Sequence, residues 1–254
     1  MKAVIFQHDE KNEYVTITLN RPHKRNAISL TMVESLAKAI EKAKTLNIKC
    51  LVITGAGQKM FSAGGDLNDF HTNLTTDQSF ERLYAMKEIL YELVSFPVPT
   101  ICLLNGNALG GGCELATACD IRIAKDGTKF GFVQASLGIT PGWGGGILLY
   151  EKVQPNFALQ WLMEGVTFSA KELKSSGWLQ QIVEDTEWGQ DEKILAHYLN
   201  KSTEQMKHFK QQFKQKIATL SLAALMNEEV RQCSQFWGSP LHKQKVAQVL
   251  NRNK

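Results

Sequence analysis

The sequence contains no apolar segment of about 18 residues, which a membrane-spanning helix would need, so no such helix is expected. The first residues do not have the order of a secretory signal, because strand-like segments begin at Ala3 and Tyr14. Linkers rich in Pro, Gly or Ser and low-complexity runs are also missing. These absences favour a cytoplasmic globular chain, and 254 residues with 43% hydrophobic content can bury one large core.

Cysteine is scarce, with five residues that lie mostly in apolar runs. They are Cys50, Cys102, Cys113, Cys119 and Cys233. Because their number is odd, we expect free, buried thiols in a reducing compartment. Neither they nor the six histidines have zinc-ligand spacing, so no metal is predicted. Cys113 has no histidine near it in sequence, which argues against a cysteine nucleophile.

Three motifs of other enzyme classes are incomplete or absent. Gly55 and Gly57 follow a strand-like run, but Met60 occupies the third glycine position of a dinucleotide fingerprint. Gly106 and Gly111 have the spacing of a phosphate-binding loop, but the next residue is glycine rather than the required lysine. No Gly-x-Ser-x-Gly elbow occurs, so a serine hydrolase has no nucleophile motif.

The most informative segment present is a run of three glycines, Gly110–Gly112, that opens a helix predicted to end near Ala118. Glycine lets the backbone approach a ligand closely, and the first amides of a helix have no partner within it. Glu114 lies about one turn along and can move a proton near those amides. This combination predicts an oxyanion hole with an acid or base beside it.

A second glycine-rich loop, Phe61–Leu67, follows the apolar run Cys50–Thr54. If the strands before the two loops are neighbours in one sheet, the amides of Gly65 and Gly111 converge on a single carbonyl oxygen. Removing one such donor typically slows a reaction on the order of 100- to 1,000-fold, so the pair is worth several kcal/mol.

From about Val4 to its C-terminus the chain resembles the crotonase (enoyl-CoA hydratase/isomerase) superfamily. The matching motifs are Asn20–Pro22 with Asn26–Ala27, Phe61–Asp66, Gly106–Glu114, Cys119–Ile121 and Leu137–Gly142. The resemblance implies an acyl-coenzyme A thioester as substrate and a thioester enolate held by the amides of Gly65 and Gly111. It also implies an α/β fold, a ClpP-like spiral of ββα units with a C-terminal helical trimerisation region.

We expect residues 1–185 to form the spiral core with the active site, and residues 186–254 to form the helical region. The helices predicted there are Asp191–Leu199, Gln205–Leu220, Leu222–Phe236 and Leu241–Leu250. In the family this region covers the site and builds the trimer contact. The resemblance therefore implies a homotrimer or a hexamer made of two trimers.

One position departs from the hydratases of this family, in which two glutamates act on opposite ends of the added water. Glu114 matches the first glutamate, but Gln134 occupies the position of the second. An amide can form hydrogen bonds but cannot act as a general base. The departure disfavours simple hydration, and also isomerisation, because the family's isomerases rely mainly on a carboxylate at that second position.

The segment around Gln134 places neutral donors where the substrate would lie. Gln134, Thr140 and Trp143, together with Gly110, are the predicted substrate-binding residues. Such a pocket suits a substrate with its own carboxylate, whose loss as carbon dioxide leaves an enolate. This segment and Phe236–Pro240 resemble the ethylmalonyl-CoA/methylmalonyl-CoA decarboxylase branch of the superfamily.

The sequence thus favours decarboxylation of a short branched malonyl-CoA by a lyase that needs no cofactor besides the coenzyme A of its substrate. The main alternative is hydration of a short 2-enoyl-CoA, with Glu114 as the only carboxylate. A scaffold without catalysis is disfavoured by Glu114 and the two glycine loops. The purely structural alternative is that Trp143 packs in the core and Gln134 caps a neighbouring element.

By resemblance, coenzyme A would contact two loops. Its predicted contacts are Lys24, Arg25, Ala27, Ala63, Gly64, Asp66 and Leu67. Lys24 and Arg25 can pair with phosphates because they stay charged near neutral pH. The alternative is that both are solvated cations in a turn.

A net charge of +4 raises nucleic-acid binding as a minor alternative, since some superfamily members bind RNA through lysines. Lys38 and Lys42 lie one helical turn apart, but Glu34 and Glu41 are interspersed with them. A second basic set is Lys201, Lys207, Lys210, Lys214 and Lys216, with Phe209 and Phe213 between them. Interspersed charge is normal for a solvated helix, so nucleic acid is not expected as a partner.

Overall fold

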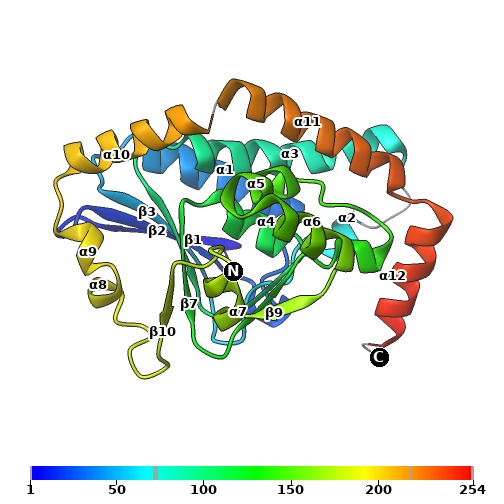
Figure 1. Ribbon diagram of the computed structural model, residues 1–254, viewed down its shortest axis with the longest axis horizontal. Helices are drawn as coiled ribbons and strands as arrows, with labels where there is room; N and C mark the ends of the chain where they lie inside the picture. Colours follow the sequence, from blue (N-terminus) through cyan, green and yellow to red (C-terminus); the bar gives the residue numbers. More distant parts are fainter. Residues whose placement is uncertain (1, 71–73, 218, 253–254) are drawn as a thin grey trace.

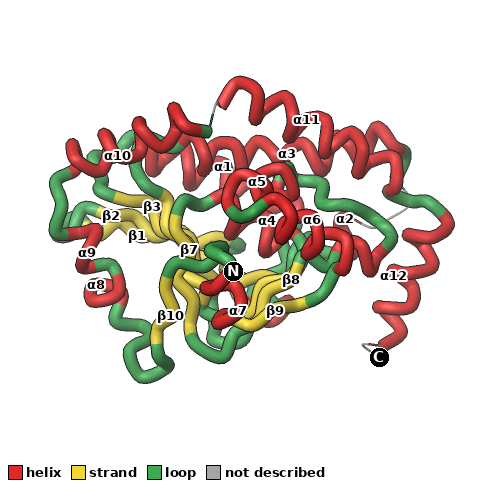
Figure 2. The backbone as a smooth tube through the Cα atoms, viewed as in Figure 1, coloured by secondary structure: helices red, strands yellow, loops and turns green. Residues whose placement is uncertain are grey.

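Two β-sheets form the centre of the molecule, and helices surround them (Figures 1 and 2). The computed structural model describes residues 2–70, 74–217 and 219–252. The larger sheet has the order β1-β2-β3-β5-β7-β10, and the smaller has the order β4-β6-β8-β9. The strands are β1 Val4–Asp9, β2 Tyr14–Leu19, β3 Cys50–Gly55, β4 Met60–Ser62, β5 Thr100–Leu104, β6 Asn107–Leu109, β7 Ile121–Lys125, β8 Lys129–Gly131, β9 Thr167–Ser169 and β10 Gln181–Val183.

The helices follow the strands along the chain and then dominate the C-terminal region. The first group is η1 Pro22–Lys24, α1 Leu30–Lys44, α2 Leu67–Phe70, α3 Thr76–Ser95, α4 Gly111–Ala118, η2 Gln134–Leu137, α5 Gly145–Lys152, α6 Pro155–Glu164 and α7 Ala170–Ser175. The second group is α8 Asp191–Ile194, α9 Ala196–Leu199, α10 Thr203–Lys216, α11 Thr219–Phe236 and α12 Pro240–Arg252.

The strand order reveals a repeated ββα unit. Strands β3, β5 and β7 are parallel neighbours in the large sheet, and the strands that follow them, β4, β6 and β8, are parallel neighbours in the small one. Each pair then leads into helices: α2 and α3, then α4, then η2 and α5. This is the predicted α/β spiral of ββα units. It sets the glycine loops after β4 and β6 side by side, because those two strands are paired.

Local sequence explains where several elements begin. Ser29 starts α1, since its hydroxyl oxygen accepts a hydrogen bond from the Met32 amide at 3.3 Å. Helix α4 is buried along its whole length, as its apolar sequence predicts. Strand β5 is buried on both faces, as expected for a central parallel strand.

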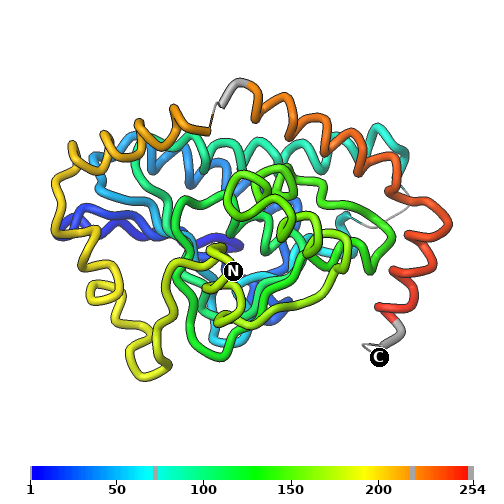
Figure 3. The backbone as a smooth tube through the Cα atoms, viewed as in Figure 1, coloured from blue at the N-terminus to red at the C-terminus, as the bar shows by residue number. Residues whose placement is uncertain are grey.

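The C-terminal helical region is present, and α11 runs beside α3 although about 140 residues separate them in sequence (Figures 1 and 3). Leu222, Met226 and Val230 on α11 belong to the main hydrophobic core. The single helix predicted over Asp191–Leu199 is wrong, because the chain forms two short helices that meet at Leu195. The division at residues 185 and 186 stays a prediction.

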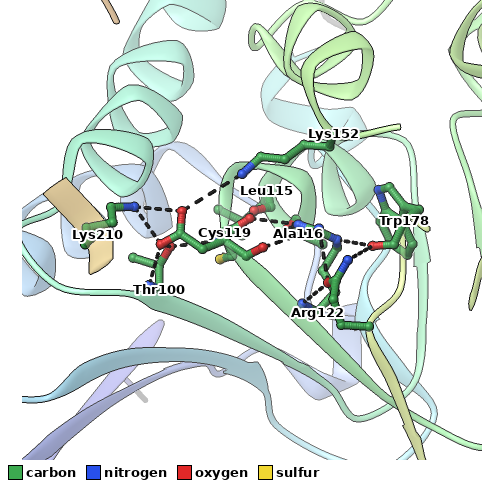
Figure 4. Close-up of polar contacts among 10 residues, drawn as sticks. Thr100, Leu115, Ala116, Cys119, Arg122, Lys152, Trp178 and Lys210 are labelled. Atoms are coloured by element: carbon green, nitrogen blue, oxygen red, sulfur yellow. Dashed lines mark hydrogen bonds and ion pairs between the residues drawn. The ribbon is translucent and has the colours of Figure 1, made fainter. Parts of the chain in front are cut away.

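A cluster of buried charges joins α10 to the large sheet (Figure 4). The Asp120 carboxylate accepts hydrogen bonds from Lys210 Nζ at 2.7 and 2.6 Å and from the Thr100 amide at 2.8 Å. Lys152 Nζ lies 3.9 Å from the same carboxylate. Arg122 donates to the carbonyl oxygens of Trp178 and Cys119. These contacts hold the start of β7 against α10 and α5.

This cluster corrects the second basic set suggested by the sequence. Lys210 is only 2% exposed and bound to Asp120, so it cannot face a nucleic acid. Lys214 Nζ donates to the carbonyl oxygen of Ser95 at 2.7 Å. The lysines of α10 therefore do not form one continuous cationic surface.

Two further expectations concern thiols and membranes. All five cysteines are free and buried, as predicted. Among the described residues, no helix has the length and apolar character required to cross a bilayer.

Candidate active site

The two glycine loops touch each other at the ends of β4 and β6. A Cβ atom added to Gly64 would lie 3.0 Å from the Gly111 nitrogen. The first loop is fixed by Ile28, whose amide donates to the Gly64 oxygen and whose oxygen accepts from the Asp66 amide, both at 2.8 Å. Within the described part of the chain, neither the Gly65 nor the Gly111 amide donates a hydrogen bond. Both predicted oxyanion donors are therefore available to a ligand.

Each glycine in the run Gly110–Gly112 meets a different local requirement. Gly110 has φ +52° and precedes the first residue of α4. A Cβ on Gly111 would lie 2.1 Å from the Trp143 ring, and one on Gly112 would lie 2.5 Å from the Ser62 oxygen. A larger side chain at residue 111 would thus collide with Trp143, and one at residue 112 with the end of β4, so either would displace the amides.

Glu114 is 2% exposed and held by three donors. Its Oε1 accepts from Gln134 Nε2 at 2.9 Å, and its Oε2 accepts from the amides of Trp143 at 2.9 Å and Gly145 at 3.1 Å. Burial raises the pKa of Glu114 above its usual value, although these hydrogen bonds oppose the shift. The arrangement favours a neutral acid more than an exposed carboxyl group would.

A small cavity of about 80 Å³ lies in front of Glu114. Every predicted catalytic and substrate-binding residue lines it, namely Gly65, Gly110, Gly111, Glu114, Gln134, Thr140 and Trp143. Sites for drug-sized ligands typically measure about 300–1,000 Å³, so this small space suits a short acyl group. The structure brings the predicted set together, while the role of each residue stays a prediction.

The predicted substrate-binding residues differ in how they face the cavity. Gln134 is buried, and its Oε1 has no hydrogen-bond partner in the described part of the chain. Trp143 packs its ring over Gly111 and against Phe70, with ring centroids 6.0 Å apart, so it also forms the wall behind the oxyanion amides. Thr140 lies at the outer edge and is exposed. Gln134 therefore combines cavity lining with a direct bond to Glu114.

Several residues at the site had no role predicted from the sequence, and Trp237 and Glu229 are two of them. Trp237 lines the cavity from the end of α11, and its Nε1 donates to the Phe70 oxygen at 2.6 Å. Glu229 accepts hydrogen bonds from the amides of Gly144 at 2.8 Å and Ile147 at 2.7 Å. The motif Phe236–Pro240 pointed toward Trp237, but no pattern distinguished Glu229 from the other glutamates of a solvated helix.

A groove of about 560 Å³ adjoins the cavity. Six of the seven predicted coenzyme A contacts line it, namely Lys24, Arg25, Ala27, Ala63, Asp66 and Leu67, and Gly64 lines the cavity itself. Groove and cavity share Ala63, Gly65, Leu67, Val133 and Leu137 in their walls. The Asp66 carboxylate is already bound to Arg21 at 2.8 Å, so it holds the loop in place.

A family model described as Enoyl-CoA hydratase/isomerase matches residues 9–249. The chain belongs to this family. As members of the crotonase superfamily, the proteins of this family act on acyl-CoA thioesters. An enoyl-CoA hydratase structure from Bacillus halodurans has a TM-score of 0.87 and 24% identity, covering 97% of this chain and 99% of that one, which supports the fold.

Curated relatives of the family include hydratases and a decarboxylase. The chain is 34% identical to the crotonyl-CoA hydratase of Syntrophomonas wolfei, over 76% of this chain and 74% of that protein. It is 28% identical to the ethylmalonyl-CoA decarboxylase of Pongo abelii, over 96% of this chain and 82% of that protein. It spans only 53% of the human methylglutaconyl-CoA hydratase, to which it is 29% identical.

Proposed function

We propose that this protein decarboxylates a short branched malonyl-CoA thioester of the ethylmalonyl- or methylmalonyl-CoA type. One observation carries the proposal: among the described residues that line the acyl cavity, Glu114 is the only one with a carboxyl group, and Gln134 stands beside it. A single acid next to two free amides suits a reaction that begins without a base and ends with protonation of carbon.

In the proposed reaction, the bond between the α-carbon and the substrate carboxylate breaks. Carbon dioxide leaves, and the electron pair moves onto the thioester oxygen, where the amides of Gly65 and Gly111 donate to the enolate. The enolate then collapses as Glu114 transfers its proton to the α-carbon. The product is the saturated acyl-CoA, and Glu114 regains a proton from water.

Gln134 links the acid to the substrate. Because Oε2 of Glu114 accepts from two amides, a proton on this residue belongs on Oε1, which faces Gln134. The Gln134 amide then turns so that its oxygen accepts this proton and its Nε2 can donate to the substrate carboxylate. A glutamate at residue 134 would instead repel that carboxylate.

The shape of the site supports a small substrate attached to coenzyme A. Phe70, Leu83 and Trp237 give the acyl cavity apolar walls. The adjoining groove offers Lys24 and Arg25 for phosphate groups, and we propose that the coenzyme A body lies there. The reaction as proposed requires no cofactor beyond the coenzyme A of the substrate.

The similarity to the decarboxylase and the similarity to the hydratase differ in coverage and in identity. The similarity to ethylmalonyl-CoA decarboxylase extends over 96% of the chain, and therefore includes the C-terminal helices that contribute Trp237. The similarity to crotonyl-CoA hydratase is higher, at 34%, but covers 76% of the chain. Hydration of a short 2-enoyl-CoA is accordingly the second candidate, with Glu114 as the only carboxylate acting on water.

We also propose a homotrimer or a dimer of trimers, as the C-terminal helices suggest, and a cytoplasmic location, which five free thiols fit. Nucleic acid is not proposed as a partner, because Lys210 is buried.

The test offers purified protein ethylmalonyl-CoA, methylmalonyl-CoA and crotonyl-CoA in parallel and identifies the products by mass. We expect the two malonyl thioesters to lose carbon dioxide and crotonyl-CoA to remain. A matched control with Glu114→Gln separates enzymatic from spontaneous loss. Consumption of crotonyl-CoA alone would refute decarboxylation and favour the hydratase.

A further inference from the structure

Two buried carboxylates, Glu114 and Glu229, bind the same short backbone segment between Trp143 and Ile147. Glu114 accepts from the amides of residues 143 and 145. Glu229 accepts from the amides of residues 144, 146 and 147, at 2.8, 3.4 and 2.7 Å. From residue 143 to residue 146 the amides alternate between the two carboxylates, residue 147 also donates to Glu229, and the segment is held between α4 and α11.

The backbone of this segment lies very close to both acids. A Cβ on Gly145 would lie 2.3 Å from Glu114 Cβ, and one on Gly146 would lie 2.8 Å from Glu229 Oε2. The glycines of the Gly144–Gly146 run therefore allow both acids to approach. A displacement of Glu229 would shift the amides that hold Glu114.

The charges of the two groups oppose each other. Glu229 is 9% exposed and Glu114 is 2% exposed, so water screens their repulsion poorly. Burial, together with the charge of Glu114, raises the pKa of Glu229 to about 8. Two buried carboxyl groups that repel each other do not ionise independently, and the protons belong to the pair.

We propose that Glu229 is a positioning residue for Glu114: it fixes the segment that orients the acid, and through its charge it makes the two carboxyl groups retain one proton between them. The inference rests on the proposed function only in taking Glu114 as the proton donor.

The other groups near the pair do not supply a compensating cation. Cys233 lies one turn after Glu229 on α11, and its thiol donates to the Thr140 oxygen. Gln134 faces Glu114 from η2, while Tyr150 of α5 lies with Glu229 along an outer groove of about 500 Å³. Glu228 and Arg231 are exposed on α11 and pair with each other at 3.6 Å. No described lysine or arginine is hydrogen-bonded to either carboxylate.

The outer groove gives the two acids different surroundings. Glu229 lines that groove, whereas Glu114 lines the acyl cavity on the other side of the segment. Glu229 can therefore exchange protons with solvent while a substrate fills the cavity. The charge of Glu229 therefore follows the external pH, and when Glu229 is ionised it repels an ionised Glu114.

The sign of the coupling predicts what Glu229→Gln does. Glu229 carries its negative charge above its pKa of about 8, and there it makes an ionised Glu114 more costly, so Glu229→Gln lowers the pKa of Glu114 in that range. A smaller fraction of Glu114 is then protonated at a given pH. On the alkaline side of the plot of kcat against pH, each unit by which the pKa of Glu114 falls lowers kcat about tenfold. KM for the substrate should stay unchanged. A purely structural cap would lower stability without moving the pH profile.

The experiment titrates the carboxyl carbons of ¹³C-labelled glutamates by NMR in the substrate-free protein. Glu114→Gln assigns one signal, and Glu229→Gln assigns the other. In the wild type we expect both signals to shift in the same two steps. In Glu229→Gln the Glu114 midpoint should fall by at least about one pH unit, a tenfold change in proton affinity. The neighbouring exposed variant Glu228→Gln should leave it in place.

If Glu114 and Glu229 each titrate in a single step in the wild type, independently of each other, the inference is overturned. This measurement uses only the wild-type protein, so it does not depend on whether the Glu229 variant folds. An unchanged Glu114 midpoint in Glu229→Gln would do the same. Coupled titration in a protein that consumes no malonyl thioester would instead support the pair and refute the proposed function.

Discussion

Glu114 is the group on which the proposed chemistry depends, because it combines burial with direct access to the acyl cavity. We expect Glu114→Gln to lower turnover about 100-fold or more, the usual scale of general acid catalysis. Coenzyme A affinity should stay nearly the same, since the groove is formed by other residues. Steady-state kinetics and calorimetric titration with coenzyme A measure the two quantities. Full activity in this variant would remove Glu114 from the mechanism.

Gln134 separates the two candidate reactions. A carboxylate at this position completes the hydratase pair but repels a substrate carboxylate, and two like charges at about 4 Å cost roughly 1 kcal/mol in water and 4 kcal/mol near a protein surface. Gln134→Glu should therefore depress decarboxylation of ethylmalonyl-CoA and raise hydration of crotonyl-CoA. The ratio of the two kcat/KM values reports the change. If neither rate changes, Gln134 does not act on the acyl group.

At the scale of elements, the buried pair of Asp120 and Lys210 fastens α10 to the start of β7. Lys210→Ala leaves a buried carboxylate without its main cation, which typically costs about 3–5 kcal/mol. Lys207→Ala on the same helix is the control, because Lys207 is exposed and should change the free energy of unfolding by less than about 0.5 kcal/mol. Denaturant unfolding measures both. Equal, small effects would mean that the pair does not stabilise the fold.

Several elements could be predicted because their sequences are long and periodic or apolar. Helix α4 ends at Ala118, as the sequence predicts, and strand β5 is a continuous apolar run that is buried on both faces. Strands β4, β6 and β8 could not be found in this way, since each spans three residues, too few to show a strand period. Each of these strands pairs with a strand of another ββα unit. The pairs therefore form only when the units assemble into the spiral.

The predicted site residues converge on one cavity because glycine motifs mark the loops that form it. Glu229 was inaccessible to the same reasoning, as its hydrogen bonds reach across 82 to 85 residues of sequence. Nothing in the local pattern of α11 signals that one of two adjacent glutamates is buried. Long-range contacts of this kind appear only when the C-terminal helices pack against the spiral.

At the scale of the whole molecule, α10–α12 expose large apolar side chains that a monomer would leave in water. They are Phe209, Phe213, Leu225, Phe236, Leu241 and Leu250. We expect these helices to contribute to a trimer contact. Light scattering should give three or six times the chain mass of 28.4 kDa. A stable mass of one chain across the micromolar range would contradict the trimer.

The most direct test of decarboxylation through an enolate is the isotopic composition of the product formed from ethylmalonyl-CoA in D₂O. We expect butyryl-CoA with a single deuterium at the α-carbon, because Glu114 exchanges its proton with solvent before it protonates the enolate. We expect no such product in Glu114→Gln above the spontaneous background. The contradicting result is unchanged ethylmalonyl-CoA in a preparation that adds water to crotonyl-CoA.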